Sequence, residues 1–247
     1  MLLLGGAVVK ASVTEVYLRY VKQGLQPFLI GAGLLLVVAA VMTLWYDLRP
    51  KPVAPARSDT DEPGDSWPDS DDHGHHHGGT AHREPRVGWL LVLPVLGLLL
   101  VAPPALGSYA AGQAGSALAG KQASAYPPLP AGDPARVSVL DYASRAVFDK
   151  GVSIGDRTVQ LTGFVATGPD GQPMLARIIL SCCAADGRPI KVGLTGQVPT
   201  GVPVDHWIEV TGRYSPRTAT DPVNDAPVPY LEVTAWREIP PPHQQYE

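Results

Sequence analysis

The sequence predicts a helical membrane anchor followed by a small all-β barrel, and three observations lead to this prediction. Two long uncharged segments occur in the first half of the 247-residue chain. The second half instead has short stretches in which apolar and polar residues alternate, as they do in half-buried strands. The segments between these parts are dominated by glycine, proline and small polar residues, which cannot bury a core.

The first candidate transmembrane helix is residues 28–45, FLIGAGLLLVVAAVMTLW, which carries no charge. At about 1.5 Å per residue it spans roughly 27 Å, close to the thickness of a bilayer core. A second uncharged segment, residues 87–106, is also long enough to cross, and a bilayer tolerates its Pro94. Aromatic residues lie near the ends of the segments, as expected at an interface: Trp45, Tyr46 and Trp89. The sequence therefore predicts two clear spans.

Residues 1–27 allow two interpretations. The stretch Leu2 to Val9 is apolar but too short to span, and Lys10 and Glu15 then interrupt the apolar pattern. No positive charge precedes the apolar run, unlike in a secretory signal peptide. The segment is either a short apolar arm with a connector, or the remainder of a truncated third span.

Residues 46–86 form a predicted disordered loop that is rich in His, Asp and Pro. Its basic residues lie close to the two membrane ends: Arg49, Lys51, Arg57, Arg83 and Arg86. The competing basic residues precede the first span: Lys10, Arg19 and Lys22. By the positive-inside rule, the loop faces the cytoplasm and the C-terminal part lies outside. We therefore expect a multi-pass plasma-membrane protein with an extracytoplasmic domain.

The C-terminal half divides into a predicted linker at 107–135, a β-barrel domain at 136–240 and a tail at 241–247. A helix is expected at Val139–Phe148, before the first strand. Strands are expected at Thr158–Thr167, Met174–Cys183, Pro189–Leu194, His206–Tyr214 and Tyr230–Ile239. Turns are expected at 168–171 and 186–187, where glycine tolerates positive φ. Short strands at this spacing favour an OB-like barrel, with a partial sandwich as the alternative.

Several motifs resemble a bacterial family of membrane proteins. They are YVKQGLQP at 20–27, HGHHH at 73–77, GWLLVLP at 88–94, APPALG at 102–107 and, most specifically, ILSCCAAD at 179–186. In these motifs the chain resembles the YcgQ-like permease-subunit family, whose molecular function is unknown. The resemblance implies a three-helix protein with an extracytoplasmic C-terminal domain, in complex with a multi-span permease subunit. The family's first helix corresponds in this chain only to Leu2 to Val9.

The loop between the predicted spans is the first candidate metal site. Its histidines are His73, His75, His76, His77 and His82, interleaved with Asp69, Asp71, Asp72 and Glu84. Imidazole and carboxylate suit Zn²⁺ or another divalent transition metal, and a flexible tract can bind such an ion weakly and exchangeably. The alternative is a solvated loop whose histidines bind nothing.

The adjacent thiols Cys182 and Cys183, with Asp186, are the second candidate site. A disulfide between neighbours is strained, because their Cα atoms are only about 3.8 Å apart. On a continuous strand the two side chains point to opposite faces. Alternation then predicts that Cys182 is buried beside Ile178 and Leu180 and that Cys183 is more exposed. The pair cannot hold one metal unless the chain bends there, so a buried core pair and a metal or redox site both stay open.

Charge and motifs exclude several functions. A net charge of −4 and a pI of ≈ 6.0 argue against a nucleic-acid partner, which requires a basic face. The sequence contains no GxSxG, HExxH or phosphate-binding loop, so we assign no catalytic or organic-cofactor residue. We expect a membrane-anchored accessory subunit of a permease complex that handles divalent metal. The alternatives are an envelope thiol-redox protein using Cys182 and Cys183, and a purely structural membrane scaffold.

Overall fold

The computed structural model describes residues 2–49, 96–97, 104–118 and 126–247. Most of the predicted loop 46–86, including all its histidines, and most of the predicted second span, 87–106, therefore lie outside the described residues. One helix in the described part is long and apolar enough to cross a membrane. Of the two predicted spans, the described residues thus include one.

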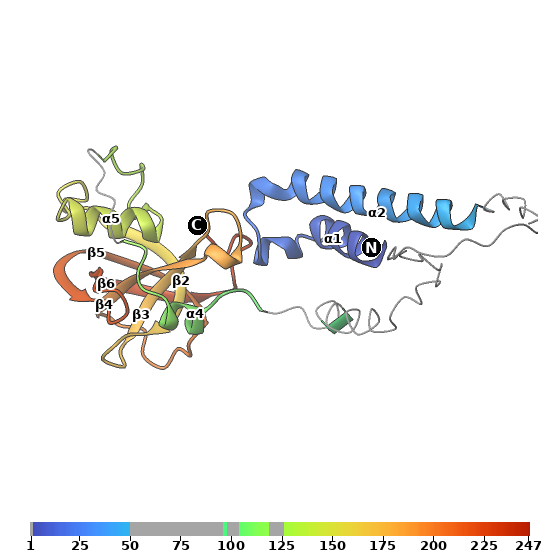
Figure 1. Ribbon diagram of the computed structural model, residues 1–247. Helices are drawn as coiled ribbons and strands as arrows, with labels where there is room; N and C mark the ends of the chain where they lie inside the picture. Colours follow the sequence, from blue (N-terminus) through green and yellow to red (C-terminus); the bar gives the residue numbers. More distant parts are fainter. Residues whose placement is uncertain (1, 50–95, 98–103, 119–125) are drawn as a thin grey trace, which may run out of the picture.

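Two N-terminal helices lie side by side and project from a β-barrel (Figure 1). Helix α1 (Leu2–Val13) packs against α2 (Gln26–Leu48), and two 3₁₀ turns join them: η1 (Val16–Arg19) and η2 (Gln23–Leu25). Glycines allow the close approach, because a Cβ on Gly5 would lie 2.9 Å from the Gly33 carbonyl oxygen. The N-terminal arm is therefore a helix packed on the candidate span.

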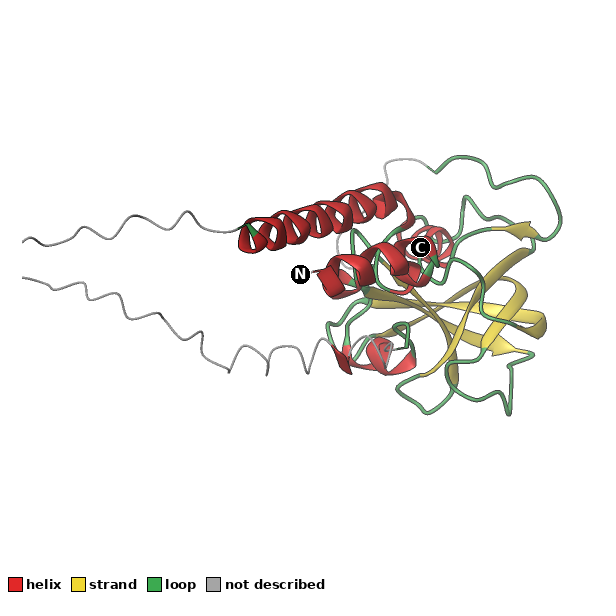
Figure 2. Cartoon of the chain, turned by 90° about the vertical axis from the view of Figure 1, so that its right-hand side faces the viewer, coloured by secondary structure: helices red, strands yellow, loops and turns green. Residues whose placement is uncertain are grey.

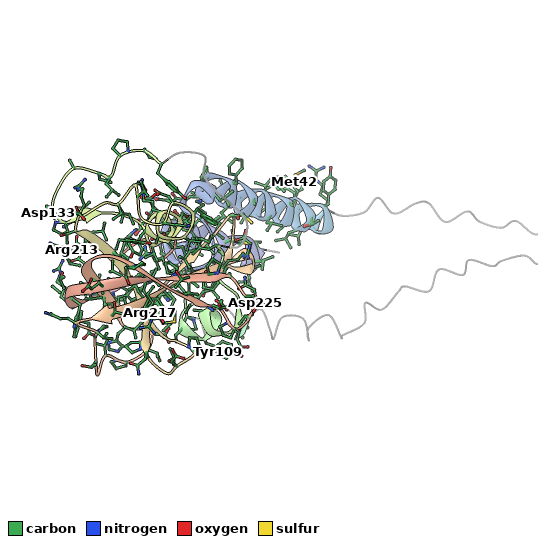
Figure 3. All side chains as sticks on the ribbon, turned by 90° about the vertical axis from the view of Figure 1, so that its left-hand side faces the viewer. Met42, Tyr109, Asp133, Arg213, Arg217 and Asp225 are labelled. Carbon is green, nitrogen blue, oxygen red and sulfur yellow. The ribbon has the colours of Figure 1, made fainter. Side chains whose placement is uncertain are left out.

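The outer face of α2 is apolar and uncovered along most of its length. Met42 lies on the part of this helix that projects from the barrel (Figure 3). The exposed large side chains include Phe28, Leu34, Leu35, Val38, Val41, Met42, Leu44 and Trp45. At the end of the helix, the Arg49 guanidinium lies 5.7 Å from the Trp45 ring centroid. Such a face is typical of a helix whose surroundings are lipid or other apolar helices.

The C-terminal half is a closed β-barrel (Figure 2). Its strands are β2 (Val159–Thr167), β3 (Pro173–Ile179), β4 (Arg188–Gly196), β5 (Trp207–Thr220) and β6 (Pro227–Ile239). The order around the barrel is β2-β3-β4-β6-β5, and β5 pairs back with β2 to close it. The β4–β6 pair is parallel and the others in the ring are antiparallel. A short strand, β1 (Ala135–Arg136), runs parallel to the start of β2. The predicted barrel is confirmed.

The main core lies between the barrel interior and α5 (Val139–Phe148), which has the predicted bounds. The Ser138 hydroxyl caps this helix by accepting a hydrogen bond from the Asp141 amide at 3.0 Å. A second, smaller core includes Phe164 and Trp207, whose rings meet edge to face with centroids 5.8 Å apart. Ile178 and Leu180 extend this second core to the end of β3, directly before the thiol pair.

The predicted linker at 107–135 is only partly a linker. Helix α4 (Ser108–Gln113) packs against β2, and Ala111 is buried in the second core. Further along, Ser116 and Leu118 are also buried. Small side chains let this backbone lie close to the barrel. From composition alone, the same small residues had indicated a flexible linker.

Candidate functional site

The thiol pair lies on a loop, and this corrects the prediction that strand β3 reaches Cys183. The β3–β4 pairing ends at Ile179 opposite Arg188. Beyond it, the Leu180 amide donates to the Glu247 carbonyl oxygen at 3.0 Å instead of to β4. The next amides, of Ser181 and Cys182, donate to the Asp186 carboxylate at 3.0 and 2.8 Å. The strand ends here because other acceptors take its hydrogen bonds.

The loop then bends into the 3₁₀ turn η4 (Ala184–Asp186), for which Cys183 is the N-cap. The Cys183 sulfur and the Asp186 carboxylate form a capping box, each accepting from the other residue's amide. The predicted turn at 186–187 has a different cause from the one expected, because Gly187 has a φ of −59°. This glycine instead provides space, since a Cβ there would lie 2.5 Å from Leu106 Cδ1.

The bend brings three candidate ligands together. The ligand atoms of Cys182, Cys183 and Asp186 all lie within 4.8 Å of one another, and no other His, Cys, Asp or Glu trio in the described residues does so. The two sulfurs are 3.6 Å apart, and the Cys182 thiol donates to Asp186 Oδ2 at 3.0 Å. Both cysteines are free thiols. Two thiolates and a carboxylate form a donor set that Zn²⁺ accepts, and they leave a fourth tetrahedral position open.

The expected burial of the two thiols is wrong. Cys182 is exposed and Cys183 is half-buried, whereas alternation placed Cys182 in the core. The alternation holds up to Ile178 and Leu180, which are buried, and fails where the strand ends. A core role for Cys182 is therefore excluded. The structure brings together the second candidate site, whereas His73, His75, His76, His77 and His82 lie outside the described residues.

The Asp186 carboxylate also raises the pKa of the exposed Cys182 thiol. Its hydrogen bond to Cys182, assisted by the Cys183 thiol, raises the pKa of Cys182 to about 11. The same hydrogen bond lowers the pKa of Asp186. Cys182 is thus a protonated thiol at neutral pH, whereas reactive redox cysteines have depressed pKa values.

A prediction follows for alkylation of this thiol. In a Cys183→Ser background, Asp186→Asn removes the negative charge beside Cys182, so its pKa falls and its thiolate fraction rises. We expect Cys182 to react with iodoacetamide about tenfold or more faster at pH 8, as read by mass spectrometry. The control Asp170→Asn, in the distant 168–171 turn, should leave the rate unchanged. An unchanged rate in Asp186→Asn would contradict the assigned hydrogen bond.

Two segments distant in sequence flank the thiol loop, and sequence reasoning missed both. Val21 pairs with Cys183 in an antiparallel bridge, and Tyr246 pairs with Ile178 in a parallel one. The tail is held by buried Arg177, whose Nη2 donates to the Gln244 carbonyl oxygen at 2.6 Å and whose guanidinium lies 4.7 Å from the Trp207 ring centroid. Burial lowers the pKa of Arg177, and the nearby Glu247 carboxylate opposes this.

The tail also reaches the start of α5. The Glu247 side chain accepts from the Val139 and Leu140 amides at 3.0 and 3.1 Å, which satisfies two amides in the first turn of the helix. No local signal in 241–247 predicted this contact, although a carboxylate is a suitable partner for a helix N-terminus.

Comparison with known families places the barrel and the thiol loop in one unit. Residues 151–247 match the family model of the DUF1980 C-terminal domain. The DUF1980 C-terminal domain thus covers β2 to β6, the thiol loop and the tail, but not α5 or the N-terminal helices α1 and α2. No curated protein and no solved structure matches the chain. The match fits an uncharacterised family and leaves the YcgQ-like permease-subunit resemblance as a prediction.

Proposed function

We propose that this chain is a membrane-anchored accessory subunit of a permease complex, and that its barrel presents an exchangeable site for Zn²⁺ or a similar divalent metal. The observation that carries the proposal is the convergence of Cys182, Cys183 and Asp186 ligand atoms within 4.8 Å on an accessible loop. Three protein ligands and one open position suit an ion that is received and passed on, since structural zinc sites have four protein ligands.

The position of the connector supports a two-span anchor. Residues 20–22 precede α2 and contact the barrel, so they lie on the barrel's side of any membrane that α2 crosses. Leu106 packs against the second core of the barrel, so the chain must cross back before it, and the uncharged residues that precede Leu106 from 87 onward are long enough to do so. The basic residues of the intervening loop favour a cytoplasmic loop and an extracytoplasmic barrel. The partners proposed are the bilayer and a multi-span permease subunit.

The charges of the chain argue against a nucleic-acid ligand for this barrel. Counted from β2, its strand order of 1-2-3-5-4, closed onto the first strand with a parallel third and fifth pair, supports the predicted OB-like barrel. OB barrels that bind nucleic acids rely on a basic groove. Here the net charge is −4 and the exposed Arg237 is paired with Glu209 at 2.6 Å.

Zinc titration of the full chain tests the proposal. The protein in detergent, reduced and with its five loop histidines changed to glutamine, is titrated with Zn²⁺ against a chromophoric chelator. We expect one bound ion, and a loss of affinity of more than about a hundredfold in Cys182→Ser and in Cys183→Ser. Even changes beyond the ligands cost about 10–100-fold in metal sites.

Matched controls separate ligand loss from general damage. Ser181→Ala and Asp170→Asn should retain the zinc affinity, because neither side chain is a ligand. Absence of stoichiometric zinc in the chain without loop histidines would overturn the metal role and favour a structural scaffold. The thiol-redox alternative requires that Cys182 alkylates rapidly at neutral pH, which its raised pKa opposes.

A further inference from the structure

The thiol loop is joined through its backbone to the segment that leads into the candidate membrane helix. Val21 forms a bridge with Cys183. On either side of it, the Lys22 amide donates to the Cys182 carbonyl oxygen at 3.1 Å, and the Ala184 amide donates to the Tyr20 carbonyl oxygen at 2.6 Å. The peptide units that carry the candidate metal ligands are therefore the ones that hold the connector.

This connector continues without a break into α2. Lys22 is the N-cap of η2, and η2 ends at Leu25, directly before Gln26 begins α2. The Gln26 side chain also donates to the Ser12 carbonyl oxygen of α1 at 3.1 Å, which links the two helices at this end. A displacement of residues 20–22 must therefore move the start of α2, and with it the end of α1.

The other hydrogen bonds that join the segment between α1 and α2 to the C-terminal tail are mostly exposed. The Tyr246 hydroxyl donates to the Arg19 carbonyl oxygen at 2.7 Å, and His243 Nε2 lies 2.6 Å from a Glu15 carboxylate oxygen. A pocket of about 310 Å³ remains between the connector and the tail, lined in part by Leu18, Val21 and Tyr246. This interface is thus incompletely packed, as expected for a contact that can open and close.

Metal binding would change the loop that makes the contact. Ligation of a divalent ion by both thiols releases two protons to solvent and replaces the Cys182–Asp186 hydrogen bond with bonds to the ion. Three ligands on one short loop then fix the 182–186 backbone, and a fixed backbone binds the connector with less loss of conformational entropy. By linkage, a docked connector strengthens metal binding by the same factor.

We propose that metal binding at Cys182, Cys183 and Asp186 and docking of residues 20–22 stabilise each other, so that α2 reports whether the site is loaded. This proposal rests on the metal role proposed above and assigns that site its regulation.

Lys22→Pro removes one of the two backbone hydrogen bonds between the connector and the thiol loop, with little backbone strain. Lys22 already has a φ of −63° and a ψ of 141°, which proline adopts readily. The variant deletes the amide that donates to Cys182 and also the side chain, whose Nζ lies 3.4 Å from the Leu180 carbonyl oxygen. Lys22→Ala removes only the side chain and is the matched control.

We expect Lys22→Pro to weaken Zn²⁺ binding about tenfold relative to Lys22→Ala, within the 5–150-fold range of typical coupling. Both are measured in the full chain without loop histidines, in nanodiscs, by competition with the chelator. As a second measurement, saturating Zn²⁺ should slow amide hydrogen exchange in residues 18–25 by a similar factor in the unsubstituted connector. The effect on exchange should vanish in Cys183→Ser.

The outcomes distinguish the two proposals. Equal and strong zinc affinity in Lys22→Pro and Lys22→Ala, with no change in exchange at 18–25, would overturn the coupling while leaving the metal site standing. No zinc binding in any variant, including the parent, would overturn both. If Lys22→Pro does not fold, the exchange measurement on the parent chain still decides the coupling.

Discussion

Two arginines placed at the centre of α2 are expected to prevent the membrane crossing proposed for this helix. Leu35 and Val38 lie near the middle of the helix and are 68% and 56% exposed, so arginine at these positions would face lipid rather than α1. Each arginine at the centre of a span costs about 2.5–3.5 kcal/mol on the insertion scale, so the double variant Leu35→Arg, Val38→Arg costs about 5–7 kcal/mol.

Thiol labelling of the segment between α1 and α2 measures whether α2 crosses the membrane. Thr14→Cys is introduced into a chain that also carries Cys182→Ser and Cys183→Ser, so that Thr14→Cys supplies the only thiol. In intact cells a membrane-impermeant maleimide should label it, because the connector lies on the barrel's side, proposed to be outside. With the two arginines, α2 does not cross and the label should be lost.

The control for this experiment keeps the apolar face. Leu35→Met with Val38→Ile keeps both side chains apolar and uncharged and should retain the labelling. Labelling that persists with both arginines would contradict the proposal that the position of this thiol depends on α2 crossing the membrane. Labelling that is absent even in the parent chain would reverse the proposed orientation.

Local sequence patterns were sufficient to predict helix α5 and the positions of the barrel strands. The amphipathic helix Val139–Phe148 has the predicted bounds, because its apolar spacing and its Ser138 cap are both encoded within a few residues. The barrel strands were found by their alternation, although β5 extends beyond Tyr214 to Thr220 and β6 begins at Pro227 rather than Tyr230. This added length pairs β5 with β6, a partner that alternation does not reveal.

The candidate site could be predicted in its residues but not in its geometry. Adjacent thiols and a nearby carboxylate were visible in the sequence, whereas the end of β3 depends on where its amides find acceptors. One acceptor is Asp186, and another is the carbonyl oxygen of Glu247, more than 60 residues away. The contact of Val21 with Cys183 is more distant still, so no local period could indicate it.

Replacement of Asp221 by asparagine is expected to destabilise the barrel strongly, because it breaks a buried ion pair. Asp221 is 0% exposed, and its Oδ2 lies 2.8 Å from Nζ of the largely buried Lys191. The same oxygen accepts from the Ser116 amide at 3.0 Å, and Oδ1 accepts from the Val223 amide at 2.9 Å. The Lys191 ammonium also donates to the Ala114 carbonyl oxygen at 2.9 Å.

This buried pair fastens the segment after α4 to the barrel. Asp221→Asn leaves the Lys191 ammonium buried without a counter-charge, which costs about 3–5 kcal/mol of the free energy of unfolding. The control Asp225→Asn lies in the same turn, is exposed, and occupies a left-handed φ of 57° that asparagine tolerates. Its free energy of unfolding should change by less than about 0.5 kcal/mol.

A double variant separates two effects: the loss of the Lys191–Asp221 ion pair, and the burial of a Lys191 charge without a partner. Lys191→Met together with Asp221→Asn removes the isolated charge, so it should recover much of the stability lost in Asp221→Asn. Urea unfolding of the full chain, followed by near-UV circular dichroism, measures all three variants. If Asp221→Asn were as stable as Asp225→Asn, the pair could not be what holds residues 114–116. These residues join the barrel to the chain that arrives from Leu106, and their detachment would loosen the domain from its anchor without removing a single candidate metal ligand.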